Sequence, residues 1–546
     1  MAIQQSYSAK TNKQGQQYSE GYLTPKSANT VQNHYMAPER VIPVIFIPGI
    51  MGSNLRMSPE RQQRLKKKNN IAWRPDSKME AIKLGNASPA ERQLQLDPSA
   101  TMVDLYDPKS NPTGDKKESA ADRHDNADPD KSTGLSKEEA RQRGWGEVFF
   151  GSYGQVLNTF ETLLNRMFSN GKLQPDWKKV VGVDPKDWQA ASALPKLSEA
   201  DLKQTTNGCW FPVHAFGYNW LQSNGEAAKL LAKRIDAVIA RYQKTAKCEK
   251  VILVTHSMGG LVGRAICHPS YGNLQDKVLG IVHGVMPAIG AAAAYRRMLA
   301  GFEGGGIADW VVGNTGPKVM PVLANAPGGL QLLPSTAYGP NWLRIIDSGG
   351  KVLKQLPARD PYDEIYKRAD VWWGLLREGW INPAGDKIAG VERTRKLLSV
   401  SRDFHQDIAH YYHPCSYAHY GCDNNRKAFQ NVMWEVKARQ AVANLDVLQI
   451  VDDSEQGNLQ LMNPQAKPAA GSYPEGISAF IRRPTDPGDQ TVPMLSADDQ
   501  LRSGIFKGVF RQTGYEHQAS YQNDKAIAST LYSIIQIAKQ MKWKEA

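Results

Sequence analysis

Unbroken apolar runs alternate with helical segments in the first half of the chain, and this alternation constrains the fold more than any other feature. The runs are 41–47 (VIPVIFI), 250–255 (KVILVT) and 278–285 (VLGIVHGV). Between the first two, 227–242 (AAKLLAKRIDAVIARY) carries Leu230 and four further aliphatic residues on one side of a helix. Strands that are apolar at every position are covered on both faces, and alternation with helices favours parallel pairing. We therefore predict an α/β fold with a mostly parallel central sheet and helices on both faces.

A sharp turn is predicted where the second apolar run ends. The segment 255–260 (THSMGG) lies between that run and a predicted helix. Such a turn lifts a serine above the sheet, and the residues two before and two after must be small because their side chains crowd. Gly259 meets this requirement, whereas Thr255 is larger than the usual glycine. We interpret Ser257 as a nucleophile, the alternative being a Ser-Gly turn at a strand end.

A serine hydroxyl needs a general base and an acid that orients the base. Asp489 follows a strand signal at 477–481, and His517 follows a mostly apolar run at 505–510. The order Ser, Asp, His is that of hydrolases whose serine lies on such a turn. We therefore predict a triad of Ser257, Asp489 and His517.

The negative charge that develops on an attacked ester oxygen needs two backbone N–H donors. One comes from the residue after the nucleophile, here Met258. The other comes from the loop after an early strand, and 48–52 (PGIMG) fits that position. We predict Ile50 and Met258 as the two donors of an oxyanion hole.

These motifs resemble those of lipase-like α/β-hydrolases. The turn at 255–260 resembles the nucleophile elbow, and 488–492 (GDQTV) resembles the acid motif of the lecithin:cholesterol and phospholipid:diacylglycerol acyltransferase branch. Asp486 competes for the acid role, but only Asp489 has Thr-Val at the family spacing. The segment 329–335 (GLQLLPS) looks like one seen in the same branch, and the PGAP1-like group is similar as well.

The resemblance extends to the character of the whole chain. A basic, heavily decorated lipase without a signal peptide looks like the antibacterial lipase effectors of type VI secretion systems. That resemblance implies a membrane phospholipid substrate, a cognate immunity or inhibitor protein, and a secretion-machine component as partners. We expect no cofactor.

The predicted triad bears on the domain organisation. The length of 546 residues alone favours three or four domains of about 150 residues. A site that joins Ile50, Ser257 and His517 instead requires one sheet to use nearly the whole chain. We predict a flexible N-terminal arm at 1–40, a hydrolase core at 41–285 with a polar insertion at 56–140, an inserted cap or lid subdomain at 286–400, and the second part of the core at 401–546. The charged stretch 107–134 is predicted to be a mobile surface insertion.

Residues 286–400 break the alternation of strands and helices. They hold an Ala-rich helix at 291–299 and a strand signal near 396–400. Tryptophans that look exposed are spaced through the segment: Trp310, Trp342, Trp372, Trp373 and Trp380. Apolar surface here would suit a lid over an acyl-chain channel. Ordinary core of an inserted subdomain is the alternative, and both interpretations stay open.

Charge and targeting signals limit the partners and the location. The net charge of +13 favours an anionic partner, but there is no basic arm, zinc-finger spacing or aromatic RNA-binding motif. We therefore expect no nucleic acid and favour a phospholipid surface or an acidic inhibitor. Residues 1–40 lack an apolar signal region. We expect synthesis in the cytoplasm and a non-Sec route into the periplasm of target cells.

One segment suggests a metal site. Residues 404–423 carry four histidines and two cysteines, but their spacing matches no standard zinc motif. We predict no metal and a structural role for this segment, although Asp486 and Asp489 leave calcium open.

The predicted function is hydrolysis of acyl esters of membrane phospholipids by a serine lipase that acts as a secreted toxin. Two alternatives stay open. The same triad serves a lipid acyltransferase, and a hydrolase scaffold with an inactive site serves a binding protein.

Overall fold

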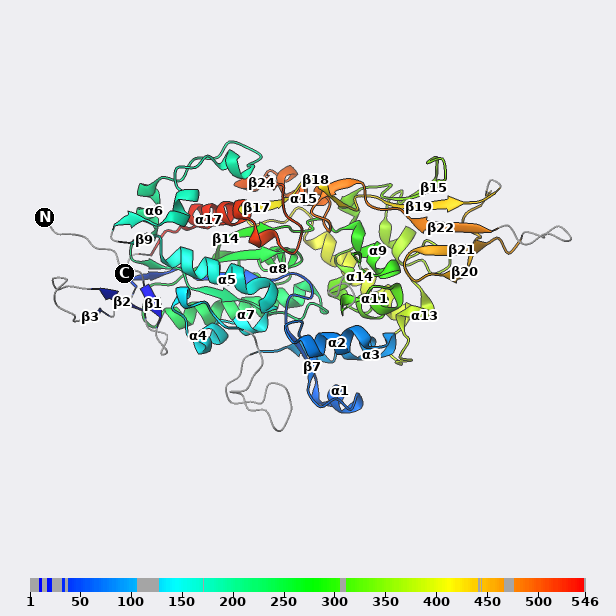
Figure 1. The fold of residues 1–546 in the computed structure, drawn as a ribbon, viewed down its shortest axis with the longest axis horizontal. Coiled ribbons are helices and arrows are strands. Elements are labelled where there is room, and N and C mark those ends of the chain that lie inside the picture. Colours follow the sequence, from blue (N-terminus) through cyan, green and yellow to red (C-terminus); the bar gives the residue numbers. More distant parts are fainter. Residues whose placement is uncertain are drawn as a thin grey trace.

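The computed structural model describes residues 9–11, 17–21, 32–34, 38–105, 127–169, 171–304, 311–439, 442, 444–465 and 476–544. Most of the predicted arm at 1–40 and most of the predicted mobile stretch at 107–134 lie outside these ranges. The described parts of the arm, β1 (Ala9–Thr11), β2 (Gln17–Gly21) and β3 (Gln32–His34), pair as an antiparallel sheet. Figure 1 shows an elongated molecule with one large sheet toward each end.

The first large sheet has six strands, and every neighbouring pair is parallel. Its order is β12 (Val213–Ala215), β5 (Val44–Ile47), β13 (Val251–His256), β14 (Val278–Gly284), β17 (Ser416–Gly421) and β24 (Gly508–Gln512). The predicted apolar runs supply β5, β13 and β14, which are buried along their whole length. The prediction of a mixed α/β fold with a parallel sheet is confirmed.

Helices cover both faces of this sheet because successive strand residues point to opposite sides. Ile45 and Leu253 pack in one core with α7 (Asn224–Tyr242) and α8 (Gly259–Ala265). Phe46 and Val254 pack in a second core with α5 (Phe150–Asn165) and α17 (Asp524–Ala538). One detail of the predicted helix is wrong: Leu230 on α7 is 48 % exposed.

The second large sheet lies at the far end of the molecule and mixes parallel and antiparallel pairs. Its order is β16 (Val352–Leu356), β15 (Leu343–Asp347), β19 (Val432–Lys437), β22 (Ile477–Ile481), β21 (Asn458–Met462) and β20 (Gln449–Asp453). It takes strands from both 286–400 and 401–546, so the boundary predicted at residue 400 does not separate the two large sheets. The predicted strand at 477–481 exists as β22, but it belongs to this second sheet.

The strand expected near 396–400 is wrong, since these residues lie within α14 (Val391–Asp407). Buried Thr394, Leu398, Ser401 and His405 recur at helical spacing. This spacing gives one buried face, which the short local run of Leu, Ser and Val did not reveal.

The expectation of exposed tryptophans is also wrong for the described ones. Trp342, Trp372 and Trp373 are buried, and Trp380 packs partly buried against the same core. The indole N–H of Trp372 donates to the Leu445 carbonyl at 2.9 Å. These rings belong to one core cluster with residues of α14 and of the second sheet. Trp310 lies outside the described residues.

The described part of the polar insertion at 56–140 is folded. Its elements include β6 (Leu55–Met57), α1 (Pro59–Arg64), β7 (Ile71–Trp73), α2 (Lys78–Asn86), α3 (Pro89–Gln95) and β8 (Thr101–Val103). Arg92 on α3 donates to the carbonyls of Leu84, Val311, Val312 and Lys318. Burial lowers the pKa of Arg92 to about 10. This guanidinium joins the insertion to α11 (Gly316–Leu323).

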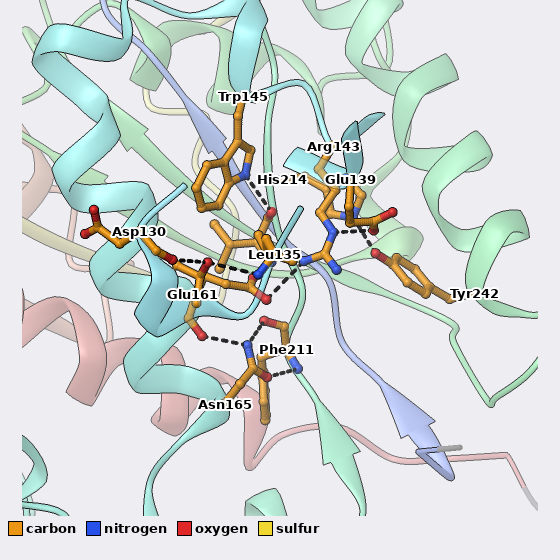
Figure 2. Close-up of polar contacts among 12 residues, drawn as sticks. Asp130, Leu135, Glu139, Arg143, Trp145, Glu161, Asn165, Phe211, His214 and Tyr242 are labelled. Carbon is orange, nitrogen blue, oxygen red and sulfur yellow. Dashed lines mark hydrogen bonds and ion pairs between the residues drawn. The ribbon is translucent and has the colours of Figure 1, made fainter. Parts of the chain in front are cut away.

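A buried charge cluster holds α4 (Lys137–Gln142) and α5 against the β12 edge of the parallel sheet (Figure 2). Arg143 contacts Glu139 at 2.7 Å and Glu161 at 3.1 Å, and its side chain is fully buried. The second oxygen of Glu161 accepts the Val213 N–H at 2.8 Å. Arg241 on α7 contacts Glu139 as well, which ties helices from both faces to one sheet edge.

Within the described ranges, no helix has the length and apolar content needed to cross a bilayer.

Candidate active site

Ser257 occupies the turn between β13 and α8 with a left-handed backbone conformation, φ 53°. Non-glycine residues adopt this conformation rarely, and it persists only where the surroundings impose it. Here the Ser257 N–H donates to the Gly284 carbonyl at 2.9 Å. A Cβ on Gly259 would lie 2.5 Å from the carbonyl oxygens of Ile47 and Pro48. The turn therefore requires glycine at 259 because the loop after β5 passes directly over it.

Thr255 fits this turn because α8 has a glycine opposite it. A Cβ on Gly263 would lie 3.0 Å from the Thr255 methyl group. The Thr255 hydroxyl pairs with Nδ1 of His283 at 3.2 Å. The absent side chain at 263 thus compensates for the larger residue at 255.

The three predicted triad residues lie in one hydrogen-bonded chain. Ser257 Oγ is 2.8 Å from His517 Nε2, and His517 Nδ1 is 2.8 Å from Asp489 Oδ2. All three residues are buried: Ser257 is 6 % exposed, His517 8 % and Asp489 1 %. A proton on Nδ1 leaves Nε2 free to accept the serine proton. This arrangement is suited to activating Ser257.

The loop around Asp489 orients its carboxylate. Oδ1 accepts the N–H groups of Thr491 at 3.1 Å and Val492 at 2.7 Å, which leaves Oδ2 for His517. The His517 N–H also donates to the Asp489 carbonyl at 2.9 Å. The Asp486 carboxylate instead accepts a hydrogen bond from the Asn431 N–H at 3.4 Å.

The chain reaches this loop by a route that the sequence did not indicate. After β17 it leaves the parallel sheet at β18 (Asp423–Ala428), builds strands of the second sheet, and returns at β23 (Asp486–Gly488), which pairs with β18. A Cβ on Gly421 would lie 2.7 Å from the Asp489 Cβ. The acid therefore lies beside the end of β17.

The predicted oxyanion loop lies directly against Ser257. A Cβ on Gly49 would be 3.0 Å from the Ser257 Cβ, and the Gly52 N–H closes a turn onto the Gly49 carbonyl at 3.1 Å. Among the hydrogen bonds of the described residues, the N–H groups of Ile50 and Met258 have no protein acceptor. Both are therefore available to a ligand oxygen.

Two residues beside the triad were not predicted. Tyr153 on α5 bonds to the Gly49 N–H at 3.2 Å and to Nδ1 of His256 at 3.0 Å. Nε2 of His256 bonds to the His517 carbonyl at 3.0 Å. In the sequence, only the place of His256 directly before Ser257 could have indicated a role near the site. Nothing in the helical pattern distinguishes Tyr153.

Three of the four histidines of 404–423, His405, His413 and His419, make hydrogen bonds inside the protein. His405 contacts the Tyr362 hydroxyl and the Gln331 carbonyl, and His419 lies 3.4 Å from the Tyr515 hydroxyl. Burial lowers the pKa of His419 to about 3, so it is neutral. In the part of the chain that the structure describes, no group of three His, Cys, Asp or Glu side chains is placed to hold a metal ion.

A parallel sheet covered by helices on both faces, with a buried Ser–His–Asp chain at the carboxyl ends of its strands, makes this a mixed α/β protein compatible with the α/β-hydrolase fold. Over 92 % of its length the chain is similar to a chain of the solved Tle4–Tli4 complex, with 31 % identity, a TM-score of 0.74 and 99 % of that chain covered. The protein belongs to the family of Tle4. No protein-family model and no curated protein matches it.

Proposed function

We propose that this protein is a serine lipase of the α/β-hydrolase fold that hydrolyses acyl esters of membrane phospholipids. The observation that carries the proposal is the chain from Ser257 through His517 to Asp489, with both contacts at 2.8 Å. Membership of the Tle4 family supports the further proposal that it is a lipase effector of type VI secretion.

The chemistry follows from the atoms present. His517 Nε2 takes the proton of Ser257 as Oγ attacks the ester carbonyl, and Asp489 stabilises the imidazolium that forms. The N–H groups of Ile50 and Met258 hold the oxyanion of the tetrahedral intermediate. His517 then gives its proton to the leaving alcohol, and water repeats the sequence to release the fatty acid.

The test is Ser257→Ala, assayed on phospholipid vesicles with analysis of released fatty acid and lysolipid. We expect loss of hydrolysis, loss of labelling by a fluorophosphonate, and an unchanged thermal transition. Hydrolysis by the folded variant at the wild-type rate would disprove the assignment. Transfer of the acyl group to an added alcohol lipid, in place of release to water, would favour an acyltransferase.

We also propose that a cognate immunity protein binds and inhibits this enzyme. The relative's structure is a complex of Tle4 with Tli4, which supports a protein partner here. We place the site of action in the periplasm of target cells, after delivery by a secretion machine. Expression directed to the periplasm should then be toxic and cytoplasmic expression much less so, while Ser257→Ala should be harmless in both. Equal harmlessness of the active protein in both compartments would contradict this placement.

We further propose that the polypeptide is one hydrolase core at 41–285 and 401–546, interrupted by an inserted cap at 286–400. The second sheet supports an additional structural unit beside the core, although its strands extend past residue 400 to Ile481.

A further inference from the structure

A line of hydrogen bonds runs beneath the triad, and its donors follow from the groups involved. The His517 carbonyl only accepts, so His256 must carry its proton on Nε2. Nδ1 of His256 therefore accepts from the Tyr153 hydroxyl at 3.0 Å. The same Tyr153 oxygen accepts the Gly49 N–H at 3.2 Å. The line connects the loop at 48–52 to the backbone of the residue that supplies the base.

Burial keeps this line in one protonation state. His256 is 1 % exposed and Tyr153 is 2 % exposed. Burial, together with the nearby His517, lowers the pKa of His256 to about 3, and burial raises the pKa of Tyr153. Both groups are therefore neutral near pH 7, and His256 has one N–H to donate.

The line also determines which N–H of the loop is available. Because the Gly49 N–H points to Tyr153, the next N–H, that of Ile50, is left for the oxyanion. A Cβ on Gly49 would lie 3.0 Å from His256 Nδ1, so the loop rests directly on this histidine. At the other end, His256 holds the backbone from which the His517 ring reaches Ser257.

We propose that Tyr153 and His256 are positioning residues that set the distance between the oxyanion loop and the base; this inference rests on the proposed function. Neither side chain touches the ester. Each acts by holding a backbone group, Gly49 N–H at one end and His517 C=O at the other. Small displacements of such groups weaken stabilisation of the transition state more than binding of the substrate.

The experiment compares Tyr153→Phe with Tyr521→Phe in the full chain, using a p-nitrophenyl ester and a fluorophosphonate probe. Tyr521 is a matched control because it is buried, packs against His256 and donates to the Thr255 carbonyl at 2.9 Å, outside the line. We expect Tyr153→Phe to lower kcat and the rate of labelling by about 10- to 100-fold, with KM within about 2-fold. Tyr521→Phe should keep kcat within about 3-fold of the wild type.

A second pair of variants covers the case in which Tyr153→Phe does not fold. His256→Gln keeps an N–H that reaches toward the His517 carbonyl, whereas His256→Leu removes it, so His256→Gln should retain at least about 5-fold more kcat. Equal kcat in these two variants would overturn the inference, as would a folded Tyr153→Phe enzyme with wild-type kcat or a loss confined to KM. A wild-type protein that is not labelled at Ser257 would overturn the proposed function as well.

Discussion

Replacement of Arg143 by methionine tests how the charge cluster of Figure 2 stabilises the fold. The guanidinium is fully buried and contacts Glu139 and Glu161. Methionine is similar in length but leaves Glu161 without its cation. Glu139 keeps Arg241, which contacts both of its oxygens at 2.7 and 2.8 Å. The main cost of the change is therefore the uncompensated charge of Glu161.

Breaking a buried ion pair from one side costs about 3–5 kcal/mol. With about 2.1 cal/mol/K of unfolding entropy per residue, a two-state transition of this chain shifts by roughly 1 °C per kcal/mol. We therefore expect the free energy of unfolding of Arg143→Met to fall by about 3–5 kcal/mol at pH 7 and its Tm by about 3–5 °C. Denaturant titration followed by tryptophan fluorescence measures the first quantity and calorimetry the second.

The loss in free energy of unfolding of Arg143→Met, called the deficit below, should depend on pH in a defined direction. Burial already raises the pKa of Glu161, against the opposing effect of Arg143, and loss of Arg143 raises it further. A carboxyl with a raised pKa in the folded state contributes stability below its unfolded pKa of about 4.3 and loses it as pH rises through the folded value. The deficit of Arg143→Met should thus shrink as pH falls from 7 toward 5.

The double variant Arg143→Met, Glu161→Gln is the control. It keeps an acceptor for the Val213 N–H but removes the charge, so most of the lost stability should return. A single variant within about 1 kcal/mol of the wild type at pH 7, or a double variant no better than the single one, would refute the reasoning.

Two further predictions concern the site. Asp489→Asn should lower kcat by about 10⁴-fold by favouring the wrong His517 tautomer, whereas Asp486→Asn should stay within about 3-fold; ester hydrolysis by both variants checks the choice of acid. Gly263→Ala should destabilise the protein by about 1–3 kcal/mol in denaturant titration because its Cβ meets the Thr255 methyl group, and adding Thr255→Ser should restore most of that loss. Additive losses in the second pair would show that the two side chains do not compete for space.

Local sequence patterns were sufficient to predict the parallel sheet and to select Ser257, Asp489 and His517 as candidates, whose side chains lie in one hydrogen-bonded chain. Each apolar run indicates a strand that is buried on both faces, and glycine at 259 indicates a crowded turn. Neither inference depends on a contact between residues distant in sequence. Asp489 was preferred to Asp486 from the Thr-Val that follows it. The structure gives that preference a physical basis, since the N–H groups of Thr491 and Val492 hold its carboxylate.

Distant contacts decided the rest. The burial of Trp342 and Trp373 depends on elements that meet only in the folded chain, so a local window made them look exposed. The strand at Ile477–Ile481 was correct as a strand but joins the second sheet, since strand propensity does not specify a partner. Tyr153 is 103 residues from His256 in sequence, and only packing of α5 on the sheet brings its hydroxyl to His256. The sequence by itself thus determined the candidate residues, because that choice depends on side-chain type and local turns, while the tertiary structure decided what holds their side chains in place.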